Sequence, residues 1–144
     1  MRRFVPLVLL FAVVMGASAC QKEPDPANPK EMKAKLESKV RMALWKVDAT
    51  TKQEKQVDAM LDVLSVDLYG FQEENNGIKR RIIGALGGES VDQAGLDKVQ
   101  KDALALFDRY TQRMMVAATD LSKVLTPEQR QKLVNLWREW EFSD

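Results

Sequence analysis

A chain of 144 residues suits a single domain and leaves little room for a second one. It contains no histidine and one cysteine, Cys20, so it lacks the commonest general base, the commonest transition-metal ligand and any intrachain disulfide. We therefore predict neither an enzyme nor a protein with a bound metal or other cofactor. Because 22 basic side chains nearly balance 21 acidic ones, the charge gives no reason to expect nucleic acid as a partner.

Residues 1–19 have the pattern of a secretory signal peptide. Arg2 and Arg3 precede an uncharged apolar stretch, residues 4–15, and small residues follow at 16–19. The apolar stretch is shorter than the ~20 residues that a membrane-spanning helix needs. We therefore predict export from the cytoplasm with removal of this segment.

Cys20 follows Ala17-Ser18-Ala19, which resembles the bacterial lipobox, where the cysteine is lipidated and becomes the new N-terminus. The pattern usually has leucine in place of Ala17, and ordinary cleavage after Ala19 would instead give a soluble periplasmic protein. The position of the only cysteine favours the lipoprotein. Gln21, not aspartate, follows the cysteine, which resembles lipoproteins sent on to the outer membrane. Residues 20–30 include three of the five prolines and predict an extended tether of ~30 Å.

Residues 31–144 predict one all-α domain, because apolar residues recur at three- and four-residue steps and no stretch alternates. The fold expected is an elongated helical hairpin of four to five helices. Its expected elements are a first helix ending near Trp45, a second from Thr50 that breaks at Asn75-Asn76-Gly77, a short helix Ile78–Leu86, a long helix from about Val91 to Leu125 and a last helix from Pro127. The tryptophans Trp45, Trp137 and Trp140 are expected in the core or in the seam of a dimer.

Three of the predicted helix starts carry a capping box, in which a hydroxyl side chain precedes glutamine by three residues. The pairs are Thr50 with Gln53, Ser90 with Gln93, and Thr126 with Gln129. The first and third also form an internal repeat at a separation of 76 residues, since Ala49-Thr50-x-x-Gln53 matches Leu125-Thr126-x-x-Gln129. We expect these residues to cap helices and to take no part in chemistry.

The repeat, the signal and the helical body together resemble the LTxxQ-repeat family of periplasmic proteins, which includes Spy-type chaperones, CpxP-type stress regulators and metal-responsive relatives. The resemblance covers about residues 31–142. It implies a cradle-shaped homodimer that binds unfolded or misfolded proteins without ATP, or that restrains an envelope stress sensor. This chain departs from the family in lacking histidine, in its near-neutral charge and in Ala49, where the motif has leucine.

Several apolar residues lie off the main stripe of their helices. They are Leu104, Met115 and Val116 in the long helix, and Val63 and Val66 in the second. Two explanations are open: other helices or a dimer partner cover them, or they bind client proteins. The basic run Lys79, Arg80 and Arg81 either forms a solvated helix face or attracts acidic segments of client proteins.

The sequence thus predicts a periplasmic chaperone-like protein, anchored to the outer membrane through Cys20 and acting as a homodimer on unfolded or misfolded clients. The alternative is an envelope-stress or metal-responsive regulatory protein that acts on a membrane sensor.

Overall fold

A computed structural model describes residues 25–142, with side chains up to residue 139. The predicted signal peptide, Cys20 and residues 21–24 lie outside the described residues. Within residues 25–142 the chain forms four helices and no strand, which confirms the all-α prediction. The helices are α2 (Pro29–Lys46), α3 (Thr51–Leu86), α4 (Gln93–Val124) and α5 (Pro127–Phe142).

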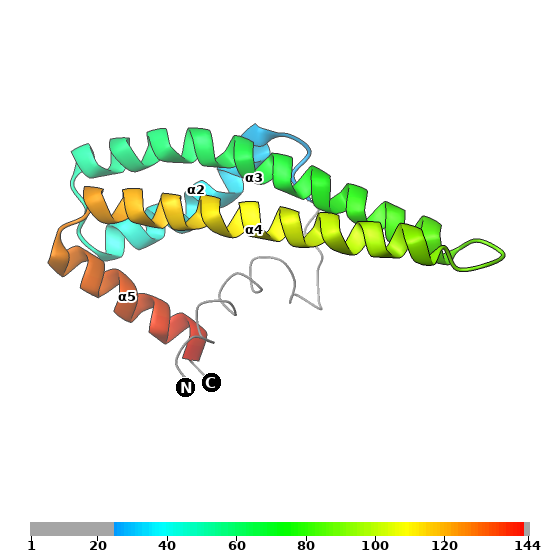
Figure 1. Ribbon diagram of the computed structural model, residues 1–144. Helices are drawn as coiled ribbons and strands as arrows, with labels where there is room; N and C mark the ends of the chain where they lie inside the picture. The colour runs from blue at the N-terminus through cyan, green and yellow to red at the C-terminus, as the bar shows by residue number, and fades with distance from the viewer. Residues whose placement is uncertain (1–24, 143–144) are drawn as a thin grey trace, which may run out of the picture.

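The two longest helices, α3 and α4, form an antiparallel hairpin (Figure 1). At 1.5 Å per residue, the 36 residues of α3 span roughly 54 Å. Helix α2 packs against α3, and α5 leaves the end of α4 and contacts α2. We call the end of the hairpin where α3 begins and α4 ends proximal, and the end where α3 leads into α4 distal. In the described part of the chain, other helices cover the proximal part, while the distal part consists of two helices alone.

Helix α3 runs without interruption through Asn75-Asn76-Gly77, so the predicted break at this point is wrong. Glycine in a helix interior costs about 1 kcal/mol relative to alanine. The next residue, Ile78, is 6% exposed and packs against Val99 and Leu106 of α4. Full burial of an isoleucine contributes about 1.5–3 kcal/mol, which exceeds the cost of the glycine. Tertiary packing therefore carries the helix through a local stop signal.

The capping box predicted at Ser90 and Gln93 is also wrong. Helix α4 begins at Gln93, and its N-cap is Asp92, whose carboxylate accepts a hydrogen bond from the Gly95 backbone N–H at 2.9 Å. The Gln93 side chain donates to Asp97 instead. Asparagine, aspartate and serine are comparable N-caps, so Asp92 replaces Ser90 at little cost and moves the helix start by two residues.

Two separate hydrophobic clusters hold the fold. The buried residues of the proximal cluster are Leu44 of α2, Val57 and Leu61 of α3, and Leu125, which lies between α4 and α5. Leu36, Val40, Ala49, Leu121, Val124 and Leu133 pack around these residues. The distal cluster joins only α3 and α4 through Ile78, Val99 and Leu106, with Phe71 and Ala103 beside them.

The two copies of the repeat meet at the proximal end. The boxes of Thr50 with Gln53 and of Thr126 with Gln129 both form: each glutamine Oε1 accepts from the backbone N–H of its own threonine, at 2.8 and 3.0 Å. Each glutamine N–H also donates to the other glutamine's Oε1, at 2.7 and 3.1 Å. Two further bonds run from Gln53 to the Val124 carbonyl and from Gln129 to the Asp48 carbonyl, each two residues before the other copy's threonine. We call this pair of glutamines the glutamine clasp.

The clasp has the form of a local twofold arrangement, because each of these three bonds made by one copy has a counterpart made by the other. Each side-chain amide is fully used, which is the condition under which a partly buried polar network stabilises a fold. The repeat is therefore a tertiary contact between two helix starts as well as a pair of caps.

Residues 25–28, which we call the leader, lie against α3, where the sequence predicted part of an extended tether. The Tyr69 hydroxyl donates to the Ala27 carbonyl at 3.0 Å, and the Gln72 amide donates to the Pro26 carbonyl at 2.9 Å. Pro26 is buried. Asn28 then caps α2, with Pro29 at its first position. The part of the tether that the structure describes is thus docked on the domain.

Candidate functional site

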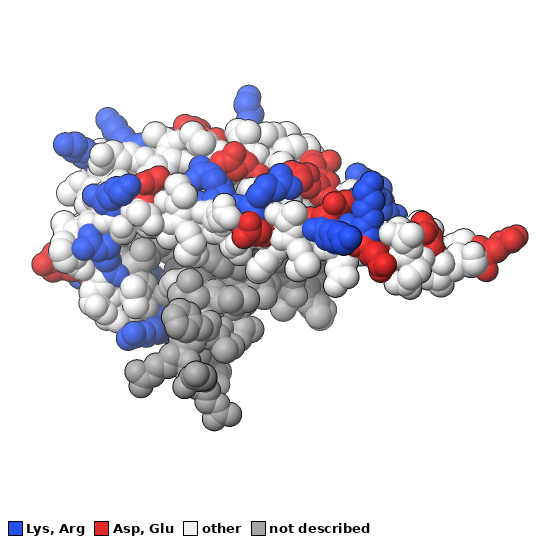
Figure 2. Space-filling view, in the orientation of Figure 1, with Lys and Arg blue, Asp and Glu red and all other residues white. Residues whose placement is uncertain are grey.

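One side of the hairpin carries a row of interhelical ion pairs. Asp67, Glu74 and Arg81 recur every seven residues along α3, which places them on one line of the helix. They pair with Arg113, Arg109 and Asp102 of α4, at 2.5, 2.6 and 2.6 Å. Figure 2 shows basic and acidic side chains side by side along the length of the hairpin. Sequence reasoning missed this row, although the seven-residue spacing on α3 was visible.

Arg81, predicted to belong to a solvated face or to attract acidic client segments, takes part in this row of ion pairs. Its guanidinium binds Asp102, and the hydrogen bond between them holds the pKa of that carboxyl below its ordinary value. Lys79 and Arg80 are exposed at the neighbouring positions. Of the three cations, Arg81 thus forms an ion pair between α3 and α4, while Lys79 and Arg80 are exposed to solvent.

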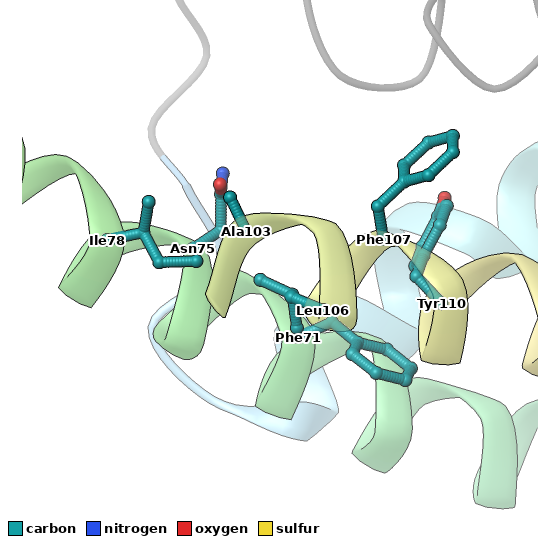
Figure 3. Close-up of a pocket in the computed structure, with 7 residues that line it drawn as sticks. All are labelled: Phe71, Asn75, Ile78, Ala103, Leu106, Phe107 and Tyr110. Carbon is teal, nitrogen blue, oxygen red and sulfur yellow. The ribbon is translucent and has the colours of Figure 1, made fainter. Parts of the chain in front are cut away.

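An apolar hollow of about 170 Å³ lies between the same two helices. Its lining residues are Phe71, Asn75, Ile78, Ala103, Leu106, Phe107 and Tyr110, as shown in Figure 3. Phe71 and Tyr110 stack edge to face, with ring centroids 5.6 Å apart and an interplanar angle of 87°. Burial raises the pKa of the Tyr110 hydroxyl above its ordinary value.

The size of the hollow limits what it can hold. Sites for small molecules and cofactors usually measure about 300–1,000 Å³, so this space is too small for most of them. It is large enough for part of an apolar side chain from another protein. Its lining offers few polar groups, and these are the Asn75 amide and the Tyr110 hydroxyl.

The exposed residues of α4 extend this apolar surface. Phe107 lines the hollow and is 50% exposed, while Leu104, three residues before it, is 63% exposed. Met115 is 40% exposed and lies eleven residues beyond Leu104, three helical turns along nearly the same line. We call Leu104, Phe107 and Met115 the α4 line. Sequence reasoning did not include Phe107 among the apolar residues expected off the main stripe, and so missed its exposure.

The other predicted apolar residues are exposed but lie elsewhere. Val116 is one position beyond Met115 and hence ~100° around the helix from it. Val63 and Val66 are 57% and 56% exposed on α3, on a side that neither α2 nor α4 covers. Among the described residues, therefore, no helix buries these side chains, and of the predicted set only Leu104 lies within one helical turn of Phe107 at the edge of the hollow.

The two tryptophans whose side chains the structure describes lie outside the core, so of the two predicted places the core is wrong for them and the seam of a dimer stays a prediction. Trp45 at the end of α2 is 74% exposed and Trp137 on α5 is 37% exposed, so neither lies in the core of this chain. The reason is helical phase: Leu44 points into the proximal cluster, and Trp45 is turned ~100° away from it. The Trp140 side chain is outside the described residues.

Among residues 25–142, no group of three or more acidic or cysteine side chains is placed to hold a metal ion. In the same range, no helix combines the length and apolar character needed to cross a membrane. Comparisons with protein-family models, curated proteins and solved structures find no match for this chain.

Proposed function

We propose that this protein is an ATP-independent, chaperone-like protein of the LTxxQ type that binds unfolded or misfolded envelope proteins in the periplasm. In this proposal Cys20 carries the lipid that anchors it to the outer membrane, and two copies pair as a homodimer. The observation that carries the proposal is the exposed α4 line beside an apolar hollow. The glutamine clasp supports the family resemblance, because it gives both copies of the repeat one shared structural purpose.

The hairpin can bind clients by reversible burial of apolar surface. Each square ångström of apolar surface removed from water contributes about 25 cal/mol, so a few exposed side chains give a weak and readily released contact. Phe107 and Leu104 offer an aromatic and an aliphatic group beside a hollow that accepts one side chain. Met115 adds a flexible side chain that adapts to different clients. The ion-paired side keeps the two helices in register while this surface is occupied.

The test is suppression of aggregation of an unfolding client, followed by light scattering, with mature protein added at increasing ratio and without ATP. Wild-type protein is expected to suppress aggregation near one dimer per client. The variant Leu104→Ser/Phe107→Ser should lose most of this activity. The matched control Val63→Ser/Val66→Ser changes two equally exposed apolar residues on the other helix and should keep it.

Circular dichroism shows whether each variant remains helical, and Leu104→Ser/Met115→Ser replaces the first variant if the loss of Phe107 unfolds the hairpin. Equal loss in the test and control variants would mean that binding does not depend on the α4 line. No suppression by the wild type at large excess would remove the chaperone function and leave the alternative, a regulatory protein that acts on a membrane sensor.

A further inference from the structure

The leader fixes where the chain leaves the domain. Its two hydrogen bonds to Tyr69 and Gln72 join it to the middle of α3, on the edge that faces away from α4 (Figure 1). Only residues 21–24 separate Cys20 from Asp25. Five residue steps span at most about 18 Å in any conformation. A lipid on Cys20 therefore holds this edge of α3 close to a bilayer surface.

The same edge of α3 is covered over half its length and bare over the rest. Near the start of α3, Lys33 of α2 binds Asp58 and Asp62 at 3.1 and 2.7 Å, and the leader then covers Tyr69 and Gln72. Steps of three and four residues continue this stripe to Asn76, Lys79, Arg80 and Ile83. Beyond the leader nothing in the described chain covers it, because Lys79 and Arg80 are exposed and Ile83 is 70% exposed.

The bare half has the chemistry of a surface that meets anionic lipid. From Gln72 to Arg80 the helix advances about 12 Å, which places both cations within the reach of the anchor. A Lys or Arg near an anionic bilayer strengthens binding about fivefold at room temperature. Ile83 lies one turn further on and can enter the interface between headgroups and acyl chains. An acyl anchor together with a basic patch is the combination that gives stable membrane attachment.

We propose that Lys79, Arg80 and Ile83 form a membrane-facing patch that lies on an anionic phospholipid bilayer when Cys20 is lipidated. The inference rests on the lipid anchor in the proposed function. It adds an orientation: the outer edge of α3 lies on the bilayer, and α4 with its apolar line lies on the opposite edge of the hairpin, open to clients.

Lysine acylation tests this orientation within a single molecule. Lipidated protein is reconstituted in vesicles of phosphatidylethanolamine with or without phosphatidylglycerol, and a water-soluble acylating reagent is added. Mass spectrometry then gives the rates at Lys79 and at Lys101, an exposed lysine on α4. We expect the ratio of the Lys79 rate to the Lys101 rate to fall at least fivefold in anionic vesicles relative to detergent, and to recover in high salt.

A charge reversal next to Lys79 provides the matched variant. Arg80→Glu should restore Lys79 acylation in anionic vesicles, whereas Arg138→Glu, the same change on α5, should leave Lys79 protected. An unchanged rate ratio in lipidated protein would overturn the patch, as would protection of Lys79 in detergent, which would indicate contact between copies. Absence of lipid on the N-terminal peptide would overturn the whole inference. Absence of lipid would also remove the anchor from the proposed function, but none of these results bears on aggregation suppression, so the patch and the chaperone activity fail separately.

Discussion

At the scale of single residues, the most informative contact is the glutamine clasp. Gln53 and Gln129 each cap their own helix and hydrogen bond to the other, so one side chain has both a local and a long-range task. The threonine partners were predictable from sequence because a capping box involves four consecutive residues. The contact between the boxes was not, since a repeat in sequence says nothing about whether its copies touch.

A double-mutant cycle measures the contact between the two boxes. Gln53→Ala and Gln129→Ala should each lower the free energy of unfolding by about 1–2 kcal/mol, because each removes a cap and leaves the other amide without its partner. The double variant should lose less free energy of unfolding than the two single variants lose together, with a coupling energy of at least about 0.5 kcal/mol. Urea denaturation gives all three values. Gln131→Ala, an exposed change in α5, is the control and should stay within about 0.5 kcal/mol of wild type. Strict additivity would mean that the clasp is only two independent caps.

At the scale of elements, the sequence predicts where helices lie better than where they stop. Caps and prolines, which act locally, predict both ends of α2, the start of α3, the end of α4 and the start of α5. The predicted break at Gly77 is wrong because burial of Ile78 keeps α3 helical at this point. The partners of Ile78, Val99 and Leu106, are more than 20 residues away in the sequence. The surface of the candidate site was partly predictable for a similar reason. Helical phase revealed Leu104 and Met115, whereas the hollow depends on how closely two helices approach.

Glycine substitutions test the continuity of α3. A Cβ on Gly77 would meet only the Arg80 side chain, at 3.8 Å, so Gly77→Ala should stabilise the protein by about 0.5–1 kcal/mol. Gly95 is the control, because a Cβ there would lie 2.3 Å from the carboxylate of Asp92, the N-cap of α4. Gly95→Ala should therefore destabilise the protein. Thermal melts of both variants provide the comparison, and destabilisation by Gly77→Ala would show that α3 needs the freedom of glycine in solution.

At the scale of the whole molecule, the two hydrophobic clusters divide the protein into unequal parts. Four helices share the proximal cluster, while the distal cluster has two helices, a hollow and several exposed apolar side chains. Local opening requires less free energy where fewer buried contacts must be lost. The distal hairpin, which carries the candidate site, is thus the part expected to open first.

Hydrogen exchange followed by mass spectrometry should resolve this difference. Backbone amides of residues 78–86 and 93–102 should exchange faster than those of residues 54–64, although all are helical. Leu106→Ala should speed exchange mainly in the distal segments, whereas Leu61→Ala should lower the global free energy of unfolding by about 2–5 kcal/mol. Uniform exchange along both long helices would instead describe a single cooperative unit.

The clasp joins residues 76 positions apart, and so closes a loop that contains both arms of the hairpin. The position of the clasp and the length of the two long helices can therefore vary independently. Equal numbers of turns can be added to α3 and α4, or taken from them, beyond the proximal cluster without moving either glutamine. The entropic cost of closing the loop rises only with the logarithm of its length. The reach of the hairpin is therefore an adjustable dimension, set by the arms and not by the base that holds them.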